Sequence, residues 1–185
     1  MSNSNTRILE SENVYLRPVE QEDMERMYEA QQNAEIRRLT GSKDVFSRDD
    51  IDQYYERIRS DENRVDFAIC LKGTEEAIGD ITLMNISQSD RNGITRIAIN
   101  EQTHFGQGYG TEAMNLMLDF AFGNLNLHRV QLDVISYNER AIKSYEKAGF
   151  KVEGRIRDEL YYDFKYHDSI IMGILEDEYK KLRGN

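Results

Sequence analysis

Three glycines at alternate positions, Gly106, Gly108 and Gly110, separate a segment with strand-like alternation, 94–100, from a helix-like segment, 111–125. Glycine has no Cβ and adopts left-handed backbone conformations readily, so this loop can turn tightly and bring N–H groups close to a partner. The first turn of the following helix adds unpaired N–H donors and a partial positive charge. The stretch therefore predicts either a tight turn or an anion site, most often one for phosphate.

Composition narrows the class of protein. The 185 residues suit one domain, 1–185, with a sizeable core. Asp and Glu outnumber Lys and Arg by 34 to 24, a formal net charge of −10. Such a chain repels nucleic acid and anionic membranes at long range, whereas it can attract cationic substrates such as amines. We therefore expect neither nucleic acid nor a membrane as a partner.

The N-terminal segment and the cysteine content indicate the cellular compartment. The polar segment 1–13 lacks the apolar core of a signal peptide, and no apolar run is long enough to span a bilayer. Cys70 is the single cysteine, which excludes an internal disulfide and a cysteine-based metal cluster. Its place in a strand pattern predicts a small buried apolar residue. We expect a cytoplasmic protein with no bound metal.

Strand and helix patterns follow one another along the whole chain. Strand patterns cover 7–19, 65–71, 77–86, 94–100, 128–135, 150–162 and 169–175, and helical patterns cover 20–33, 47–58, 111–125 and 138–149. Ser47 is the expected N-cap of its helix, with Asp50 three residues on, and Gly149 is expected to end the last helix. A long antiparallel run before the first βαβ-like crossover predicts a mixed α/β fold.

The glycine spacing excludes two well-known phosphate loops. A Walker loop needs four residues between glycines followed by Lys and Ser or Thr, and none is present. The dinucleotide fingerprint needs G-x-G-x-x-G after the first strand, whereas this G-x-G-x-G loop follows roughly the fourth.

A second motif lies in the helical segment that begins at Asn138, "NERAIKSYEKAGF". Tyr145 is two turns after Asn138 and on the same face, with Ala141 and Ile142 between them. By themselves these residues suit a core aromatic residue and an N-cap.

Together, the two motifs resemble those of the GNAT family of acetyl-CoA-dependent N-acetyltransferases. "FGQGYGTEAM" resembles the pyrophosphate loop and "NERAIKSYEKAGF" the second signature, and the likeness covers nearly the whole chain. The branch that it resembles most contains the ribosomal-protein N-terminal and the spermidine acetyltransferases. The resemblance implies a GNAT-type, mainly antiparallel sheet of six to seven strands flanked by helices. Phe105 is a departure, because the family often has Gln or Arg at that place.

The resemblance also implies the cofactor site. Backbone N–H groups of the loop would hold the pyrophosphate of acetyl-CoA, and the pantetheine arm would lie between the splayed strands 94–100 and 128–135. Asn138 would bond the arm, and a main-chain N–H near Ile99 would polarise the thioester carbonyl. The full set of expected cofactor residues is Ile97, Ala98, Ile99, Phe105, Gly106, Gln107, Gly108, Tyr109, Gly110, Thr111, Asn138, Ala141 and Tyr145.

Two proton movements need side chains. The resemblance makes Tyr145 the general acid that protonates the departing thiolate. For the base, Glu101 lies just before the glycine loop, and a water chain is the alternative. Asp80, Thr82 and His104 lie nearby in sequence, whereas His128 is expected to be a structural anchor and His167 an exposed hairpin residue.

The acceptor is expected to be an amine: a protein N-terminus or a small amine, with a polyamine as the alternative. In the family two N-terminal helices and the last hairpin wall its site, which here suggests Arg37, Arg38, Leu39, Tyr161 and Tyr162. The spermidine enzymes carry acidic residues where this chain has Ser42 and Lys43, and an acidic pair that "GDITLMNI" lacks. Two other classes stay open, a non-catalytic CoA-binding module and a nucleotide-phosphate binder of unrelated fold. A homodimer is a further possibility.

Overall fold

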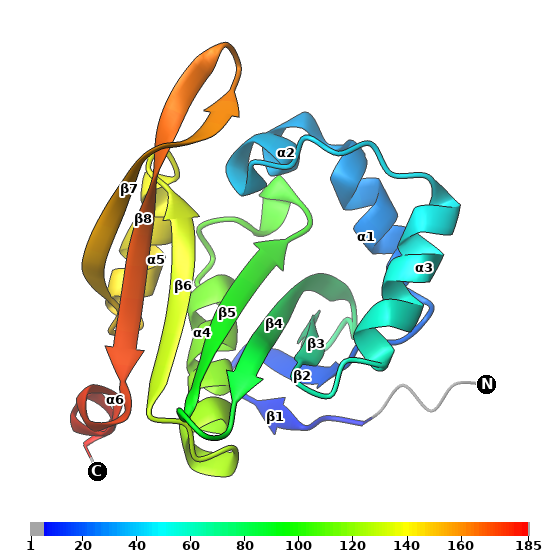
Figure 1. Ribbon diagram of the computed structural model, residues 1–185. Helices are drawn as coiled ribbons and strands as arrows, with labels where there is room; N and C mark the ends of the chain where they lie inside the picture. The colour runs from blue at the N-terminus through cyan, green and yellow to red at the C-terminus, as the bar shows by residue number, and fades with distance from the viewer. Residues whose placement is uncertain (1–5, 185) are drawn as a thin grey trace.

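The computed structural model describes residues 6–184, and its strands join one sheet in the order β1-β2-β3-β4-β5-β6-β8-β7 (Figure 1). The strands are β1 (Leu9–Glu10), β2 (Val14–Pro18), β3 (Val65–Leu71), β4 (Ala77–Ser87), β5 (Asn92–Ile99), β6 (Arg129–Ile135), β7 (Lys151–Tyr162) and β8 (Lys165–Leu175). All neighbouring pairs are antiparallel except β5 and β6. The predicted mixed, mainly antiparallel sheet is confirmed. It has eight strands rather than six to seven, partly because a turn at residues 11–13 divides the segment 7–19 into β1 and β2.

The helices are α1 (Asp23–Gln32), α2 (Ala34–Thr40), α3 (Arg48–Arg59), α4 (Tyr109–Asp119), α5 (Glu139–Lys147) and α6 (Glu176–Arg183). The predicted Ser47–Asp50 capping box begins α3, and Gly149 follows α5 with φ +101°, as expected. The sequence patterns missed α2 and α6. Both helices are short, and each buries a single side chain, Ile36 or Tyr179, so neither shows a helical apolar stripe.

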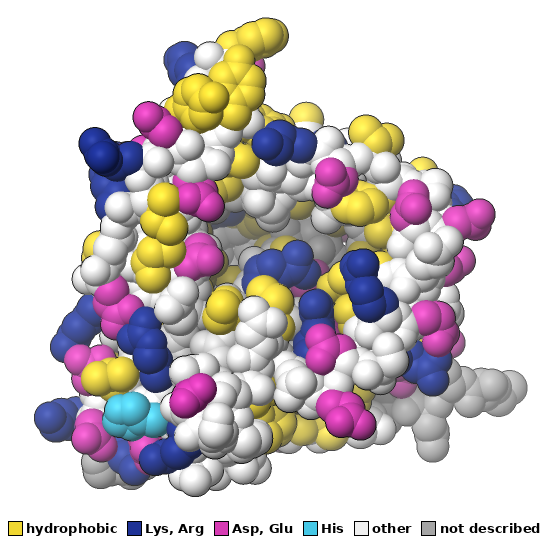
Figure 2. Space-filling model, viewed as in Figure 1, with side chains coloured by type: hydrophobic (Ala, Val, Ile, Leu, Met, Phe, Trp, Pro, Cys, Tyr) yellow, Lys and Arg dark blue, Asp and Glu magenta, His cyan; other side chains and the backbone are white. Residues whose placement is uncertain are grey.

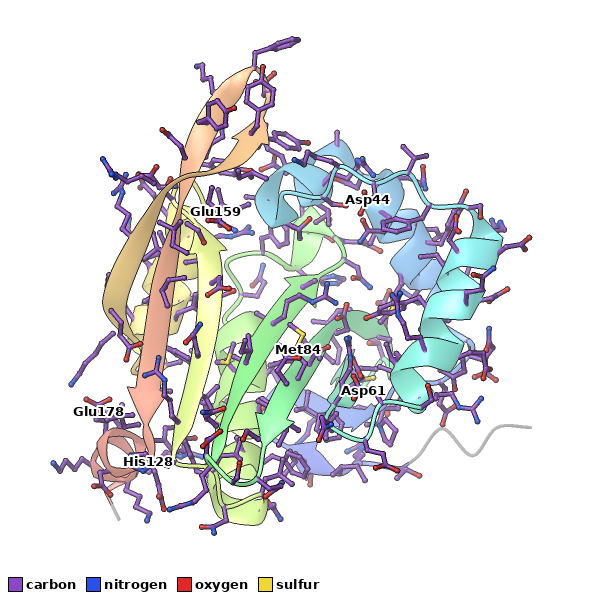
Figure 3. The ribbon with its side chains drawn as sticks, viewed as in Figure 1. Asp44, Asp61, Met84, His128, Glu159 and Glu178 are labelled. Carbon is purple, nitrogen blue, oxygen red and sulfur yellow. The ribbon has the colours of Figure 1, made fainter. Side chains whose placement is uncertain are left out.

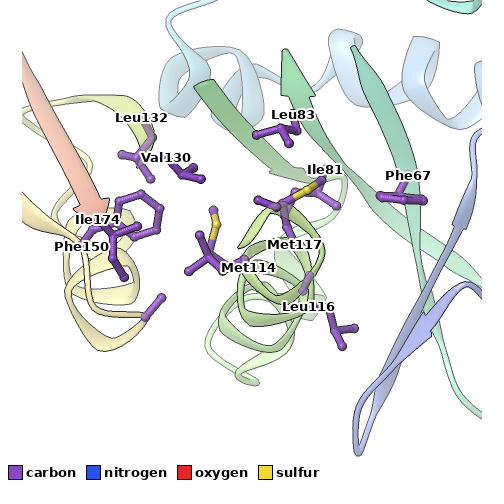
Figure 4. Close-up of a cluster of buried hydrophobic side chains, with 14 of the residues drawn as sticks. Phe67, Ile81, Leu83, Met114, Leu116, Met117, Val130, Leu132, Phe150 and Ile174 are labelled. Carbon is purple, nitrogen blue, oxygen red and sulfur yellow. The ribbon is translucent and has the colours of Figure 1, made fainter. Parts of the chain in front are cut away.

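The main core lies between the sheet and α4 (Figure 4). Met114 and Met117 of α4 are buried there with Ile81 and Leu83 of β4, and Phe150 and Ile174 extend the same cluster toward β8. Strand side chains alternate between faces, so Asp80, Thr82 and Met84 of β4 lie on the opposite face. In Figure 1, α4 and α5 lie behind the sheet, and α1, α2 and α3 form an arch over the other face.

The helix after the glycine loop is held against the first strands. Glu112, in the first turn of α4, accepts hydrogen bonds from Ser11 Oγ at 2.6 Å, Asn13 Nδ2 at 2.7 Å and the Asn13 backbone N–H at 3.0 Å. These bonds hold the pKa of Glu112 below its usual value against the opposing effect of its burial. Toward its end the helix passes into a π-helical turn, Phe120–Asn124.

No helix within residues 6–184 is both long and apolar enough to cross a membrane. Residues 1–5, which begin the polar segment discussed above, lie outside the described part of the chain.

Candidate active site

The glycine loop ends at the beginning of α4 and leaves open space in front of it. Gly106 and Gly108 have φ of +74° and +88°, and a Cβ built on either would meet no atom within 4 Å. The helix begins at Tyr109, with Gly108 as N-cap, two residues earlier than the sequence pattern indicated. The positive φ values explain why glycine is required here, and the open space fits a ligand.

In the described part of the chain, the N-terminus of α4, like those of α1 and α6, has no side-chain cap hydrogen bond, whereas those of α2, α3 and α5 have one. In those three helices the side chains of Asn33, Ser47 and Asn138 accept hydrogen bonds from first-turn N–H groups. Gly108 offers no side chain, so no side-chain cap satisfies the first N–H groups of α4. These donors and the helix dipole are available to an anion, which is the chemistry that a pyrophosphate requires.

The parallel pair β5–β6 separates next to this loop. Only Asn92, Gly93 and Ile94 pair with β6, although β5 continues to Ile99 and β6 to Ile135. The Asn100 N–H bonds to Ile78 O of β4 at 2.8 Å. Because N–H groups of successive strand residues point to opposite sides, the Ile97 and Ile99 N–H groups point toward the gap beside β6. The strands therefore part as expected, and a backbone donor near Ile99 points to the side where they part.

Asn138 caps α5 and ties it to α2. Its Oδ1 accepts the Ala141 N–H at 3.3 Å, and its Nδ2 donates to Leu39 O at 3.3 Å. A hydrogen bond also joins α5 to α4, since the Thr111 and Ser144 hydroxyls are 2.9 Å apart. The capping role of Asn138 is confirmed, and its contact with a pantetheine arm stays a prediction.

Tyr145 lies on α5 against the edge of the main core. Its ring packs against Phe150 at 6.1 Å between centroids in an edge-on arrangement. Burial raises the pKa of Tyr145 to about 12, and the positive charge of Arg140 only partly opposes this effect. The phenol therefore keeps its proton at neutral pH, as a general acid must. The same packing also makes Tyr145 a core residue, and its role as general acid stays a prediction.

Glu101 is exposed at the end of β5, on the side of α1. Its Oε2 accepts a hydrogen bond from Thr103 Oγ1 at 3.3 Å, and it borders a pocket formed with Arg26 and Asn33. Within residues 6–184, no hydrogen bond joins Glu101 to Tyr145 or Asn138. Its role as base stays a prediction and, from an exposed position, needs a water.

The face of the sheet under α1–α3 is hollowed, with Lys or Arg side chains on its floor (Figure 2). Asp66, Thr82 and Arg96 stand opposite one another across β3, β4 and β5. Arg64 donates to both oxygens of Asp66 at 2.7 and 2.8 Å, and Thr82 Oγ1 donates to Asp66 Oδ1 at 2.7 Å. This face therefore carries a charged network instead of an apolar core.

Asp80 belongs to the same face and is buried. Burial raises its pKa, and Arg96, whose Nη2 donates to Asp80 Oδ2 at 3.4 Å, opposes that rise. The Arg96 side chain is 53% exposed and the Asp80 side chain 9%, so the arginine faces the hollow and the carboxylate lies beneath it. Asp80 is thus shielded from direct contact with a substrate.

The expected wall residues have structural partners. Arg37 donates to Asp44 O at 2.7 Å, and Arg38 pairs with Glu35 at 2.8 Å. Leu39 supplies the carbonyl that Asn138 bonds, and Tyr161 packs on Tyr166 in the β7–β8 hairpin.

The histidine expectations had mixed outcomes. His128 is exposed just before β6 and lies 3.8 Å from Glu176, which suits a structural anchor. The expectation that His167 is an exposed turn residue is wrong, because it lies within β8, partly buried, with its ring 4.7 Å from that of Tyr137. The hairpin turn comes earlier than the sequence suggested. Cys70 is fully buried, as predicted.

An uncapped glycine-bounded helix next to a parted pair of parallel strands is the arrangement that the resemblance to acetyl-CoA-dependent acyltransferases led us to expect. The model of the acetyltransferase (GNAT) domain matches residues 13–151, and the chain belongs to this family. Spermidine N(1)-acetyltransferase of Escherichia coli K12 is 30% identical over 166 residues, 90% of this chain and 88% of that protein. Probable N-acetyltransferase YjcK of Bacillus subtilis is 28% identical over 181 residues, 92% of this chain and 98% of its own.

A solved structure gives the same fold. Spermidine N-acetyltransferase from Vibrio cholerae, in complex with CoA and spermine, has a TM-score of 0.84 at 28% identity and covers 90% of this chain and 97% of its own. The protein is therefore an acetyl-CoA-dependent N-acetyltransferase that acts on an amine. A nucleotide binder of unrelated fold is excluded.

The sequence reasoning missed the network of Arg64, Asp66 and Arg96, and also Arg140. Asp66 and Arg96 alternate with apolar residues in strand patterns, a sign that one face of these strands is polar, but nothing in the sequence shows that they meet. Arg140 was overlooked although it lies inside the second motif.

Proposed function

We propose that this enzyme transfers the acetyl group of acetyl-CoA directly to a primary amine of a small acceptor that enters the hollow under α1–α3. The observation that carries the proposal is that β5 and β6 stop pairing after Ile94, beside the uncapped N-terminus of α4, which leaves room for a slot between them. A slot of this kind lets an acyl chain cross the sheet from the cofactor side to the acceptor side.

The residues have separate tasks in this mechanism. Acetyl-CoA, when bound, supplies the activated acetyl group as a thioester. The loop from Gly106 to Thr111 holds the pyrophosphate, and the Ile99 N–H stabilises the negative charge that develops on the carbonyl oxygen. As the amine nitrogen forms its bond to the carbonyl carbon and the carbon–sulfur bond breaks, Tyr145 gives its proton to the sulfur. Glu101 accepts the proton lost by the amine through a water.

A polyamine is the acceptor that the comparisons favour, because curated relatives and solved neighbours are named spermidine acetyltransferases. The net charge of −10 and the acidic residues on the elements that frame the hollow agree with this candidate (Figure 3). These residues are Asp44 between α2 and α3, Asp61 after α3 and Glu159 in the β7–β8 hairpin. The positive charge of the arginines on the floor of the hollow would repel a polyamine. No feature specifically favours a protein N-terminus as the acceptor.

The test combines binding with turnover. A thermal-shift comparison of acetyl-CoA, CoA, ATP and NAD should show stabilisation by the first two only, since a ligand of the native state raises its apparent stability. Release of CoA with a panel of spermidine, spermine, amino acids and short peptides then ranks the acceptors by kcat/KM. Binding of CoA without turnover on any amine would indicate a non-catalytic CoA-binding module.

We also propose that the enzyme is a cytoplasmic homo-oligomer, with a dimer as its smallest unit. The edge strand β7 exposes Val152 and Ile156, and the hairpin exposes Phe164 and Tyr166, which together form an apolar edge. A Vibrio cholerae relative is described as dodecameric. With Cys70 as its single cysteine the chain forms no internal disulfide, which suits a reducing compartment. Light scattering after size-exclusion chromatography tests the oligomeric state, and a monomer at micromolar concentration would contradict it.

A further inference from the structure

Arg140 is the second residue of α5, and it reaches across to the glycine loop. The carbon at the centre of its guanidinium lies 3.5 Å from the centroid of the Phe105 ring. A guanidinium at this distance is attracted to the ring face. The contact holds a positive charge directly over the first residue of the loop that leads into α4.

This charge has no carboxylate partner. Within residues 6–184, no carboxylate oxygen lies within 4.0 Å of the Arg140 side chain, whereas Arg38, Arg129 and Arg155 each have an ion pair. Glu35 acts on Arg140 only from a distance, and partial burial lowers the pKa of Arg140. The side chain is nevertheless exposed, so its donors can meet a ligand.

Two helix N-termini add positive potential near Arg140, which Glu35 opposes from a distance. Arg140 lies in the first turn of α5, where the helix dipole disfavours a cation. The hydrogen bond between Thr111 and Ser144 joins this helix to the first turn of α4, whose own N–H groups lack a side-chain cap. An unpaired cation beside the uncapped end of α4 is electrostatically unfavourable unless an anion joins them.

We infer that Arg140 binds the pyrophosphate of acetyl-CoA, with the Phe105 ring as the platform that orients its guanidinium. The inference rests on the assignment of the glycine loop to the pyrophosphate. Phe105 itself offers the phosphates no hydrogen-bond donor, and Arg140 brings the missing donors and charge from α5. Arg140 is a cofactor-binding residue in this scheme and takes no part in proton transfer.

Calorimetric titration with CoA tests this role without relying on activity. Arg140→Gln should weaken CoA binding by about ten- to a hundredfold, the usual range for a lost charge-assisted hydrogen bond. Arg140→Lys should recover part of the affinity, because lysine keeps the charge but lacks the planar fork that stacks on a ring. Arg155→Gln is the matched control, since Arg155 is exposed, lies on β7 and pairs with Asp168. A melting curve of each variant establishes that it is folded.

Dephospho-CoA, which lacks the 3′-phosphate, identifies the group that Arg140 meets. The Arg140→Gln substitution should weaken the affinity for dephospho-CoA by the same factor as the affinity for CoA. A loss that disappears with dephospho-CoA, or unchanged CoA affinity in a folded Arg140→Gln, would overturn the inference. Failure of the wild-type protein to bind CoA would instead disprove the assignment of the loop, so the two failures are distinguishable.

Discussion

The two faces of the sheet carry different kinds of polar groups. On the α4–α5 face the proposed binding groups are backbone N–H groups, glycines and the place where β5 and β6 part, set over an apolar core. On the α1–α3 face the groups are charged side chains from three strands, paired closely with one another. In the proposed function, the first face binds its ligand through the geometry of the main chain, whereas the second selects its ligand through the identity of its side chains.

This difference suggests which site such enzymes share, the cofactor site, and which site varies between them, the acceptor site. A pyrophosphate needs donors at fixed spacing, which the end of a helix supplies whatever its side chains are. An acceptor amine is selected by charge and shape, which change with single substitutions. Relatives at about 30% identity can therefore share the cofactor face while their acceptors differ.

The largest effect should come from a side chain in the glycine loop. Gly108→Val places a branched side chain in the space where the phosphates would lie, so CoA affinity should fall on the order of a thousandfold, as expected when several charge-assisted bonds are lost. The CoA-induced thermal shift should disappear. Unchanged CoA affinity would remove the basis of the cofactor-site assignment.

Gly73→Val is the matched control for Gly108→Val. Gly73 has φ +91° and open space around it, but it lies in the turn between β3 and β4. Valine at either position costs roughly 1–2 kcal/mol of backbone strain. Both variants should therefore lose similar stability, and only Gly108→Val should lose CoA binding.

The next effect concerns the proposed proton donor on the same face. Tyr145→Phe keeps the ring that packs on Phe150 and removes the phenol proton, so kcat should fall by about 10²–10⁴. The KM for acetyl-CoA should change little, because the lost interaction belongs to the transition state. Steady-state kinetics beside a melting curve measures both.

Tyr179→Phe controls for the loss of a buried phenol. Its hydroxyl bonds Asn115 O at 3.0 Å and Asp119 Oδ1 at 2.9 Å, far from the slot. This variant should lose roughly 1–2 kcal/mol of stability and keep its kcat. A folded Tyr145→Phe with wild-type kcat would make Tyr145 a core residue only.

The contrast also explains what the sequence could reveal. Gly106, Gly108 and the Asn138–Tyr145 spacing are local features, since one loop and one helix fix their geometry, and they predicted the fold family and the cofactor. The pairing of Arg64 with Asp66 joins residues two apart, but the contacts of Thr82 with Asp66 and of Arg96 with Asp80 arise only after strands have paired. No local pattern shows such contacts, so the acceptor side could not be predicted in the same way.

A smaller effect should appear on the acceptor face. Arg96→Gln removes a cation that faces the hollow, so kcat/KM for spermidine should rise by roughly three- to tenfold, as expected for one partly exposed charge. Arg183→Gln is the control, because Arg183 is similarly exposed, 46% against 53%, and pairs with Asp119 on α4. A fall in spermidine turnover in a folded Arg96→Gln would show that Arg96 supports the polyamine, and would refute the repulsive role.

The smallest expected effect is an absence of pH dependence where an ordinary tyrosine would produce one. Burial raises the pKa of Tyr145 to about 12, so its phenol stays protonated until the pH rises toward that value. A tyrosine with an ordinary pKa near 10 would lose half of its acid form at pH 10, and kcat would fall with it. We therefore expect kcat to show no basic limb from Tyr145 between about pH 7 and pH 10. The comparison is the pH profile of kcat for the wild type and for Tyr145→Phe, which should run parallel over this range. A basic limb with an apparent pKa near 10 that disappears in Tyr145→Phe would mean that solvent reaches the phenol and that the α5 face does not isolate its proton donor.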